Sequence, residues 1–103
     1  MSGATLLPLE TEADWQAFHT IRRAALFQER GRGEAYDLAH PDDRHPANTP
    51  LLYRVDGQAI GVLRLDRLAD RRAAIRRVAI ERSHRAQGHG RRMIAAALQR
   101  LRE

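Results

Sequence analysis

The segment from residue 73 onward most constrains what this chain can fold into. Residues 73–80 have the composition of a strand, a connection runs from Glu81 to Gly88, and residues 89–102 carry apolar side chains at helical spacing. The connection leads into the sequence Arg-Ala-Gln-Gly-His-Gly at positions 85–90. A glycine-bearing turn that opens a helix gathers backbone N–H groups without internal partners, and the helix dipole adds positive charge there. This pattern predicts a binding site for an anion such as a pyrophosphate.

Two other glycine-rich phosphate loops fit this sequence worse. A dinucleotide-binding fingerprint has a third glycine at the position of Met93 and an acidic residue about 20 positions further on, and the sequence ends at Glu103 first. A P-loop needs a lysine, but all 18 residues counted as Lys or Arg are arginine. We expect Gly88 and Gly90 to be required because a Cβ would hold a phosphate away from the backbone, and we expect Gly90 to adopt φ > 0.

Composition restricts the remaining chemistry. The chain has no cysteine, which removes disulfides, thiolate metal sites and a cysteine acyl-enzyme. Its net charge of +5, carried by arginine, suits an anionic partner, although codon bias in a GC-rich genome is the plainer explanation. No apolar run approaches the roughly 20 residues that span a bilayer, and the N-terminus lacks the features of a secretory signal. We therefore expect one cytoplasmic domain over residues 1–103, with no metal site.

The rest of the chain supplies a sheet and a second helix. Thr11 is the predicted N-cap of a helix that we expect to end near Gly31 and Gly33. Its buried face is formed by Trp15, Phe18, Ile21, Ala25 and Leu26. An edge strand is predicted at 6–9, and a long connection with at most a short helix at 34–39 is predicted over 30–50. Two further strands are predicted at 51–55 and 58–66. The turns are predicted at Asp56-Gly57 and at Asp70-Arg71-Arg72. This order predicts an α/β (α+β) fold, a mixed and mostly antiparallel sheet with flanking helices.

The loop is similar to motif A of the GNAT superfamily of N-acetyltransferases, written Arg/Gln-x-x-Gly-x-Gly/Ala. Arg85, Gly88 and Gly90 fill its defined positions, and Val78-Ala79-Ile80 matches the apolar triplet that ends the family's fourth strand. The resemblance implies that acetyl-CoA is the cosubstrate and that its acetyl group passes directly to an amine, without an acyl-enzyme. Ala86 stands where many members have another glycine, and alanine is tolerated there if φ is negative. The implied cofactor-binding residues are Val78, Ala79, Ile80, Arg85, Ala86, Gln87, Gly88, His89, Gly90 and Arg91.

The catalytic residues stay open. Many members of the family place a base on the fourth strand, at positions matching Ala74 and Arg76, and neither is a base here. Glu81, just past the strand, is the nearest carboxylate and the single candidate, against the plainer interpretation of a solvated loop residue. The segment that shapes the acceptor pocket in the family contains four further titratable residues, which either act on the acceptor or cap local amides in a turn. They are His40, Asp42, Asp43 and His45.

The remaining expectations concern completeness and alternatives. Family members continue after the motif helix with further strands. We therefore interpret the chain as a fragment, a truncated gene product or a protein completed by a partner, and we expect a homo-oligomer joined near the fourth strand.

Two alternatives to an enzyme are a CoA-binding subunit without activity and an Arg-rich nucleic-acid-binding module. Interspersed acidic residues and few aromatic residues disfavour the second. Trp15 and Phe18 are predicted as core, whereas Tyr36 and Tyr53 are unassigned.

Overall fold

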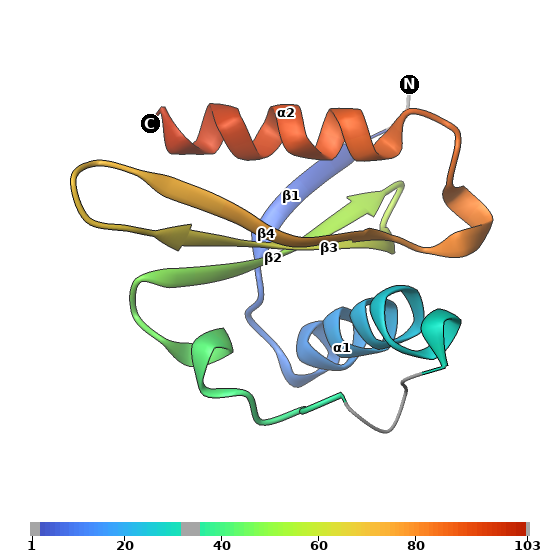
Figure 1. The fold of residues 1–103 in the computed structure, drawn as a ribbon. Coiled ribbons are helices and arrows are strands. Elements are labelled where there is room, and N and C mark those ends of the chain that lie inside the picture. The colour runs from blue at the N-terminus through green and yellow to red at the C-terminus, as the bar shows by residue number, and fades with distance from the viewer. Residues whose placement is uncertain (1–2, 32–35, 103) are drawn as a thin grey trace.

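The computed structural model describes residues 3–31 and 36–102 of the chain. The elements in order are β1 (Ala4–Pro8), α1 (Glu12–Leu26), the 3-10 turns η1 (Gln28–Arg30) and η3 (Pro41–Arg44), β2 (Asn48–Val55), β3 (Gln58–Arg67), β4 (Ala73–Ile80), the 3-10 turn η4 (Arg82–His84) and α2 (His89–Leu101). The strands form one sheet in the order β1-β2-β3-β4, and every described pairing is antiparallel. The two helices lie on opposite faces of this sheet (Figure 1). The predicted α/β fold is confirmed.

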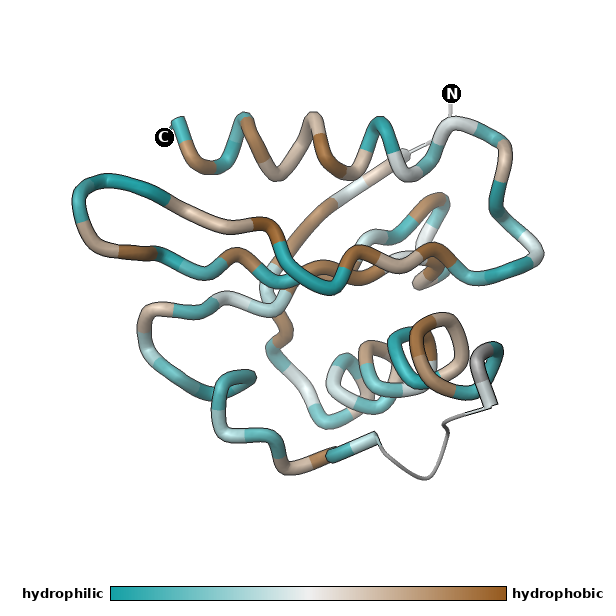
Figure 2. The backbone as a smooth tube through the Cα atoms, in the orientation of Figure 1, coloured by the Kyte–Doolittle hydropathy of each residue, from teal (hydrophilic) through white to brown (hydrophobic). Residues whose placement is uncertain are grey.

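Each face of the sheet has its own apolar core. On the α2 face, buried side chains from β2 and β3 pack against Met93 and Ala97. On the α1 face, Phe18 and Ile21 pack against a smaller set. The strand side chains of that smaller set are Leu52, Val62 and Ala79. Figure 2 shows the apolar stretches of the strands between the two helices. Burial of such side chains is worth about 1.5–3 kcal/mol each, so these two cores hold both helices against the sheet.

Local signals place the start of α1 and the first hairpin as predicted. The Thr11 side chain accepts a hydrogen bond from the Asp14 amide, and Asp14 accepts from the Thr11 amide, which completes a capping box. Asp56 and Gly57 have φ of 52° and 84°, as a type I′ turn requires. Pro8 lies on the edge strand, where a missing N–H is tolerated.

The structure corrects the predicted connection between α1 and β2. The helix ends at Leu26 rather than near Gly31, because a 3-10 turn follows and Gly31, with φ of 71°, caps that turn instead. Of the short helix predicted over 34–39, the first two residues lie outside the described residues and the others are not helical. β2 begins at Asn48 and includes Pro50, which lies beyond the last β1 pair and needs no N–H on that side.

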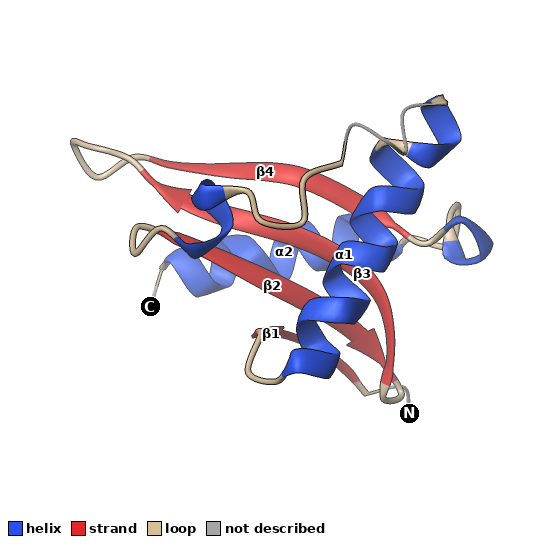
Figure 3. Ribbon diagram, turned by 90° about the horizontal axis from the view of Figure 1, so that it is seen from below, coloured by secondary structure: helices blue, strands red, loops and turns tan. Residues whose placement is uncertain are grey.

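Segment 36–47 and α1 lie on the same face of the sheet, with η3 beside β2 (Figure 3). The polar side chains of this face come from that segment, from α1 and from β3. Within the described residues, no helix is long and apolar enough to cross a membrane.

Candidate functional site

The loop between β4 and α2 presents a row of backbone N–H groups. Gly88 is the N-cap of α2 and is left-handed, with φ of 82°. The first hydrogen bond of the helix runs from the Arg92 amide to the Gly88 carbonyl, at 3.2 Å. The amides of residues 86–91 donate to no acceptor in the part of the chain that the structure describes. Six consecutive amides at a helix N-terminus form the kind of concavity that binds phosphate oxygens.

The conformations of two loop residues differ from expectation. Gly90 does not have positive φ, so the prediction that it requires φ > 0 is wrong; it lies in the first turn of α2, where the chain is already helical. Ala86 has φ of 62°, so the expectation of negative φ there is also wrong. An alanine in the left-handed region costs roughly 1–2 kcal/mol. The glycine that the turn needs is Gly88, where an added Cβ would also lie 3.0 Å from the Arg92 guanidinium.

The side chain of Arg85 points away from this row of amides. Its Nε donates to the Ile80 carbonyl at 2.8 Å, and its two terminal nitrogens donate to both carboxylate oxygens of Glu29 at 2.7 Å each. The hydrogen bond from Arg85 holds the pKa of Glu29 below its usual value. Arg85 therefore ties the start of the loop to β4 and to the turn after α1. The Arg85 amide also donates, to the Arg82 carbonyl at 3.3 Å, so it does not belong to the row of unpartnered amides.

Arg92 supplies positive charge at the loop. Its Nη2 donates to the Gln87 carbonyl at 2.8 Å and lies 3.2 Å from His89 Nδ1. The guanidinium thus folds back over the turn, one helical turn after the Gly88 N-cap. Arg91 is exposed at the same end of the helix. A cation so close to free amides raises the affinity of the loop for an anion.

β4 contains a bulge before the predicted triplet. Val62 pairs with Ala79 and Arg64 pairs with Arg76, so one residue of β3 faces two residues of β4. Arg77 is one of these two, and its φ is 54°. Such bulges re-aim side chains and are common beside functional sites.

Beyond the bulge, β4 runs along the open edge of the sheet toward the loop. Val78 and Ile80 pack toward the α2 core, whereas Ala79 packs toward the α1 core. A groove of about 300 Å³ lies beside this stretch and is also lined by Ala25, Leu26 and Arg85. The groove therefore joins the predicted triplet to Arg85, the first residue of the predicted loop.

Glu81 is already hydrogen-bonded. It accepts from the Ser83 hydroxyl at 2.6 Å, and its other oxygen lies 2.9 Å from His84 Nδ1. The hydrogen bond from Ser83, with a further contribution from His84, lowers the pKa of Glu81. A lowered pKa makes a carboxylate a weaker general base. Glu81 nevertheless lines a surface groove of about 440 Å³ against α1, next to the groove along β4.

The acceptor-side residues do not act as one group. The ring nitrogens of His40 and His45 accept hydrogen bonds from the Asp42 and Ala47 amides, so the two histidines cap local amides. Asp43 is instead buried, with 3% of its surface exposed. Within the described residues, no group of three acidic, His or Cys side chains is arranged to hold a metal.

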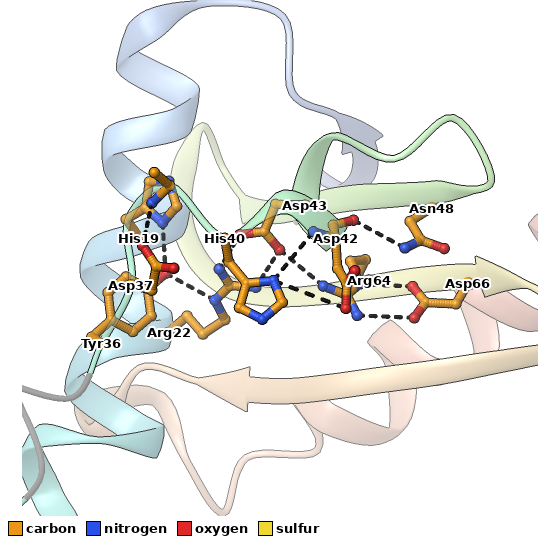
Figure 4. A network of polar contacts seen from close by, with 11 residues as sticks. His19, Arg22, Tyr36, Asp37, His40, Asp42, Asp43, Asn48, Arg64 and Asp66 are labelled. Atoms are coloured by element: carbon orange, nitrogen blue, oxygen red, sulfur yellow. Dashed lines mark hydrogen bonds and ion pairs between the residues drawn. The ribbon is translucent and has the colours of Figure 1, made fainter.

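Asp43 is the centre of a buried ion-pair network (Figure 4). It accepts from Arg22 of α1 and from Arg64 of β3, at 2.9 and 3.0 Å to the same oxygen. Arg64 also donates twice to Asp66, at 2.7 and 2.9 Å. Burial would raise the pKa of Asp43, but the hydrogen bonds and charges of Arg22 and Arg64 outweigh it and lower that pKa. The carboxylate is therefore ionised and has a structural role.

Sequence reasoning missed this network, although one signal was present. Arg64 and Asp66 occupy alternate positions of an otherwise apolar strand, on the face that α1 covers, and such inward polar residues need partners. Tyr36 joins the network, because its hydroxyl accepts from Arg22 Nε at 2.8 Å and lies 2.6 Å from His19 Nδ1. Tyr53 is buried on the opposite face, and its hydroxyl has no partner among the described residues.

Comparison with known proteins decides the family. The model of the acetyltransferase (GNAT) family matches residues 15–103, which include β4, the loop and α2. The chain belongs to the GNAT acetyltransferase family. Among curated proteins, none matched the sequence.

Solved GNAT structures share the fold. A GCN5-related N-acetyltransferase from Kribbella flavida is 26% identical, with a TM-score of 0.67 over 98% of this chain and 36% of its own. Escherichia coli ElaA is 18% identical, with a TM-score of 0.80 over 98% of this chain and 70% of its own. The PaiA N-acetyltransferase of Thermoplasma acidophilum, solved in complex with coenzyme A, is 14% identical, with a TM-score of 0.73 over 97% and 72%. This GNAT chain thus spans between about a third and three quarters of the length of these three.

Proposed function

We propose that this GNAT protein is an acetyl-CoA-dependent N-acetyltransferase that transfers the acetyl group directly to a primary amine of a small molecule or protein. The observation that carries the proposal is the row of unpartnered amides at residues 86–91, which directly follows Arg85, a residue that lines the groove along β4. Support also comes from the Thermoplasma acidophilum neighbour, which was solved in complex with coenzyme A. The residues present fit the cosubstrate, since Gly88 allows the left-handed turn into α2 and the Arg92 guanidinium lies over that turn.

Each part of the proposed site has a separate role. Acetyl-CoA supplies the activated acetyl group. The amides of residues 86–91 bind its pyrophosphate, and each charge-assisted hydrogen bond contributes about 1.5–3 kcal/mol. Val78 to Ile80 offer edge N–H and C=O groups to the pantetheine arm, since β4 pairs only with β3 among the described strands. The ion pair between Arg85 and Glu29 holds the first residue of the loop in place.

Glu81 is the proposed general base. An amine acceptor is protonated at neutral pH and must lose a proton before it attacks the thioester. Glu81 is ionised, it lies directly after β4, and its contact with His84 provides a second titratable group to which the proton can move. A Glu81→Gln variant is therefore expected to lower kcat, whereas Glu10→Gln, which changes an exposed carboxylate before α1, leaves it unchanged. Equal kcat in both variants would remove Glu81 from the mechanism.

The location and the assembly of the protein are further proposals. We place it in the cytoplasm as a homo-oligomer. The outer edge of β4 carries unpaired backbone groups beside the partly buried Ile75 and Val78, and such an edge favours pairing with a second chain. Light scattering over a concentration series tests the assembly, and a monomer at every concentration would contradict it.

Acetyl transfer is tested with the 103-residue chain, acetyl-CoA and a panel of amines, with products detected by mass spectrometry. In parallel, free coenzyme A is expected to raise the Tm, as any ligand of the native state does. A raised Tm without any acetylated product would support a CoA-binding subunit in place of an enzyme. An unchanged Tm at millimolar coenzyme A, together with no product, would overturn the proposed function.

A further inference from the structure

Two cavities on the α1 face of the sheet adjoin each other beside β4. The larger has a volume of about 580 Å³ and is lined by Arg64, Asp66, Arg76 and Arg77, together with Asp42. The smaller, of about 60 Å³, is also lined by Arg64 and Arg77 and reaches Tyr36 and the buried Arg22. Arg77 thus lies at the junction of both cavities. Neither cavity is part of the groove along β4 or of the amide row.

The charges along these cavities do not balance at their floor. Asp43 forms ion pairs with Arg22 and Arg64, and Asp66 forms ion pairs with Arg64 and Arg76. Three arginines therefore share two buried carboxylates. This leaves one positive charge in excess. Arg77 adds a second, since it makes no hydrogen bond or ion pair within the described parts of the chain.

The nearby acidic residues do not neutralise this excess. Asp42 lies at the rim, with 56% of its side chain exposed, and its nearest ionisable neighbour is His40 at 3.9 Å. Asp37 is exposed, and one of its oxygens accepts from the Ala39 amide. Water screens both carboxylates, as it screens the exposed Arg76 and Arg77, and neither carboxylate forms an ion pair with Arg77. The N–H donors of Arg77 are therefore available to an anion.

Arg77 is also held in a costly conformation. It occupies the left-handed region, with φ of 54°, at a bulge position where glycine is the usual residue. Non-glycine residues in this region persist where the surrounding structure imposes them, and they concentrate at functional sites. The bulge places Arg77 directly before Val78, the first residue of the triplet along the groove. An anion bound to Arg77 would therefore lie one residue along β4 from the proposed path of the thioester.

We propose that Arg77, supported by Arg76, binds an anionic group of the acceptor, a carboxylate or a phosphate, and that the acceptors are amines that carry such a group. This inference rests on the proposed acetyl transfer. The unpaired guanidinium of Arg77, next to Arg76, disfavours a purely cationic amine such as a polyamine, because like charges repel. An anionic group on the same molecule reverses the sign of the interaction and leaves the amine to face the groove.

The test uses pairs of acceptors that differ only in the anion. Glycine is compared with glycinamide, O-phosphoethanolamine with ethanolamine, and spermidine serves as the polycation. The kcat/KM of at least one member that carries the anion is expected to exceed that of the member without it by about tenfold or more, as loss of a charge-assisted hydrogen bond implies. The pair that shows the larger ratio identifies the carboxylate or the phosphate. Equal values in both pairs, or a preference for spermidine, would overturn the proposal.

A matched pair of arginine variants assigns the effect to Arg77. Arg77→Gln is expected to raise KM for the anionic acceptor about tenfold and to raise it much less for the acceptor without the anion. Arg71→Gln is the control, because Arg71 is also an exposed arginine with positive φ, of 60°, but lies in the turn before β4. Equal effects of the two substitutions would contradict a specific role for Arg77.

A binding measurement separates this inference from the proposed function. Amide chemical shifts of Arg76, Arg77 and Val78 are followed by NMR during titration with glycine, O-phosphoethanolamine and ethanolamine, without coenzyme A. Shifts with an anionic probe, but not with ethanolamine, are expected even if no acetyl transfer occurs. If coenzyme A binds and these amides respond to none of the probes, the inference fails while the proposed function stands.

Discussion

The loop at residues 85–91 and the buried network around Asp43 are two ways of building a polar site in one small fold. The loop is contiguous, and its binding groups are backbone amides in a turn with two left-handed residues, Ala86 and Gly88. The network joins side chains from α1, η3 and β3, and every member depends on the others for charge balance. Substitutions in the network should therefore change the stability of the fold, whereas substitutions in the loop should change the affinity for the ligand.

The largest expected effect is on the network. Asp43→Ala leaves Arg22 and Arg64 without the carboxylate that they share, and breaking such a buried pair typically costs about 3–5 kcal/mol. Asp42→Ala changes the adjacent exposed carboxylate and should alter the free energy of unfolding by less than about 0.5 kcal/mol. Urea unfolding measures both. Similar values for the two variants would show that the network does not stabilise the fold.

The next effect separates affinity from stability in the loop. Gly88→Ala and Gly57→Ala place alanine at nearly the same φ, 82° and 84°, so each should cost roughly 1–2 kcal/mol of stability. Only the first should weaken coenzyme A binding, by about tenfold or more, since its Cβ would crowd the Arg92 guanidinium beside the row of amides. Isothermal titration calorimetry gives the two Kd values. Equal Kd values would mean that coenzyme A binds elsewhere.

A third prediction concerns the stability of the fold at low pH. The pKa of Asp14 is lowered from 3.8 to about 2, first by the hydrogen bond from the Glu10 amide and then by Arg54. Because the folded-state pKa lies below the unfolded one, the carboxylate stabilises the fold above pH 3.8, and this contribution is lost as the pH falls toward 2. Asp14→Asn should flatten the loss of stability in that range, as measured by Tm against pH. Glu12→Asn, in the same turn, should leave the curve unchanged.

The smallest expected effect tests strain in the loop. Ala86→Gly relieves a left-handed alanine and should stabilise the fold by up to about 1 kcal/mol. Ala95→Gly, on the exposed side of α2, should destabilise it by about the same amount. Opposite signs in thermal unfolding are therefore expected. Destabilisation by both would show that Ala86 is relaxed in its conformation.

The same contrast explains what could be predicted from the sequence. The capping box at Thr11 and the turn at Asp56 involve residues a few positions apart, so local pattern was sufficient for both. The predicted loop lies where expected. The φ angles of Ala86 and Gly90 depend on how the preceding turn enters α2, and the local sequence pattern does not determine this. The contact between Arg85 and Glu29 joins residues that are far apart in the sequence, so it was not predicted either.

The buried position of Asp43 could not be predicted from its own neighbourhood. Pro41 and Asp42 before it indicate a turn, and a turn is present. Its burial arises only when α1 and β3 bring Arg22 and Arg64 to the same point. The inward polar residues of β3 were the available signal, and they indicate that partners exist without identifying them.

The most direct test of the account is an NMR titration of the 103-residue chain with coenzyme A, following backbone amides in both regions. We predict that the amides of residues 86–91 shift first and most, that Val78 to Ile80 follow, and that Asp43 and Arg64 stay in place. Gly88→Ala should remove the first set of shifts. Unchanged amides at residues 86–91 under millimolar coenzyme A would contradict the assignment of the loop as the cofactor site.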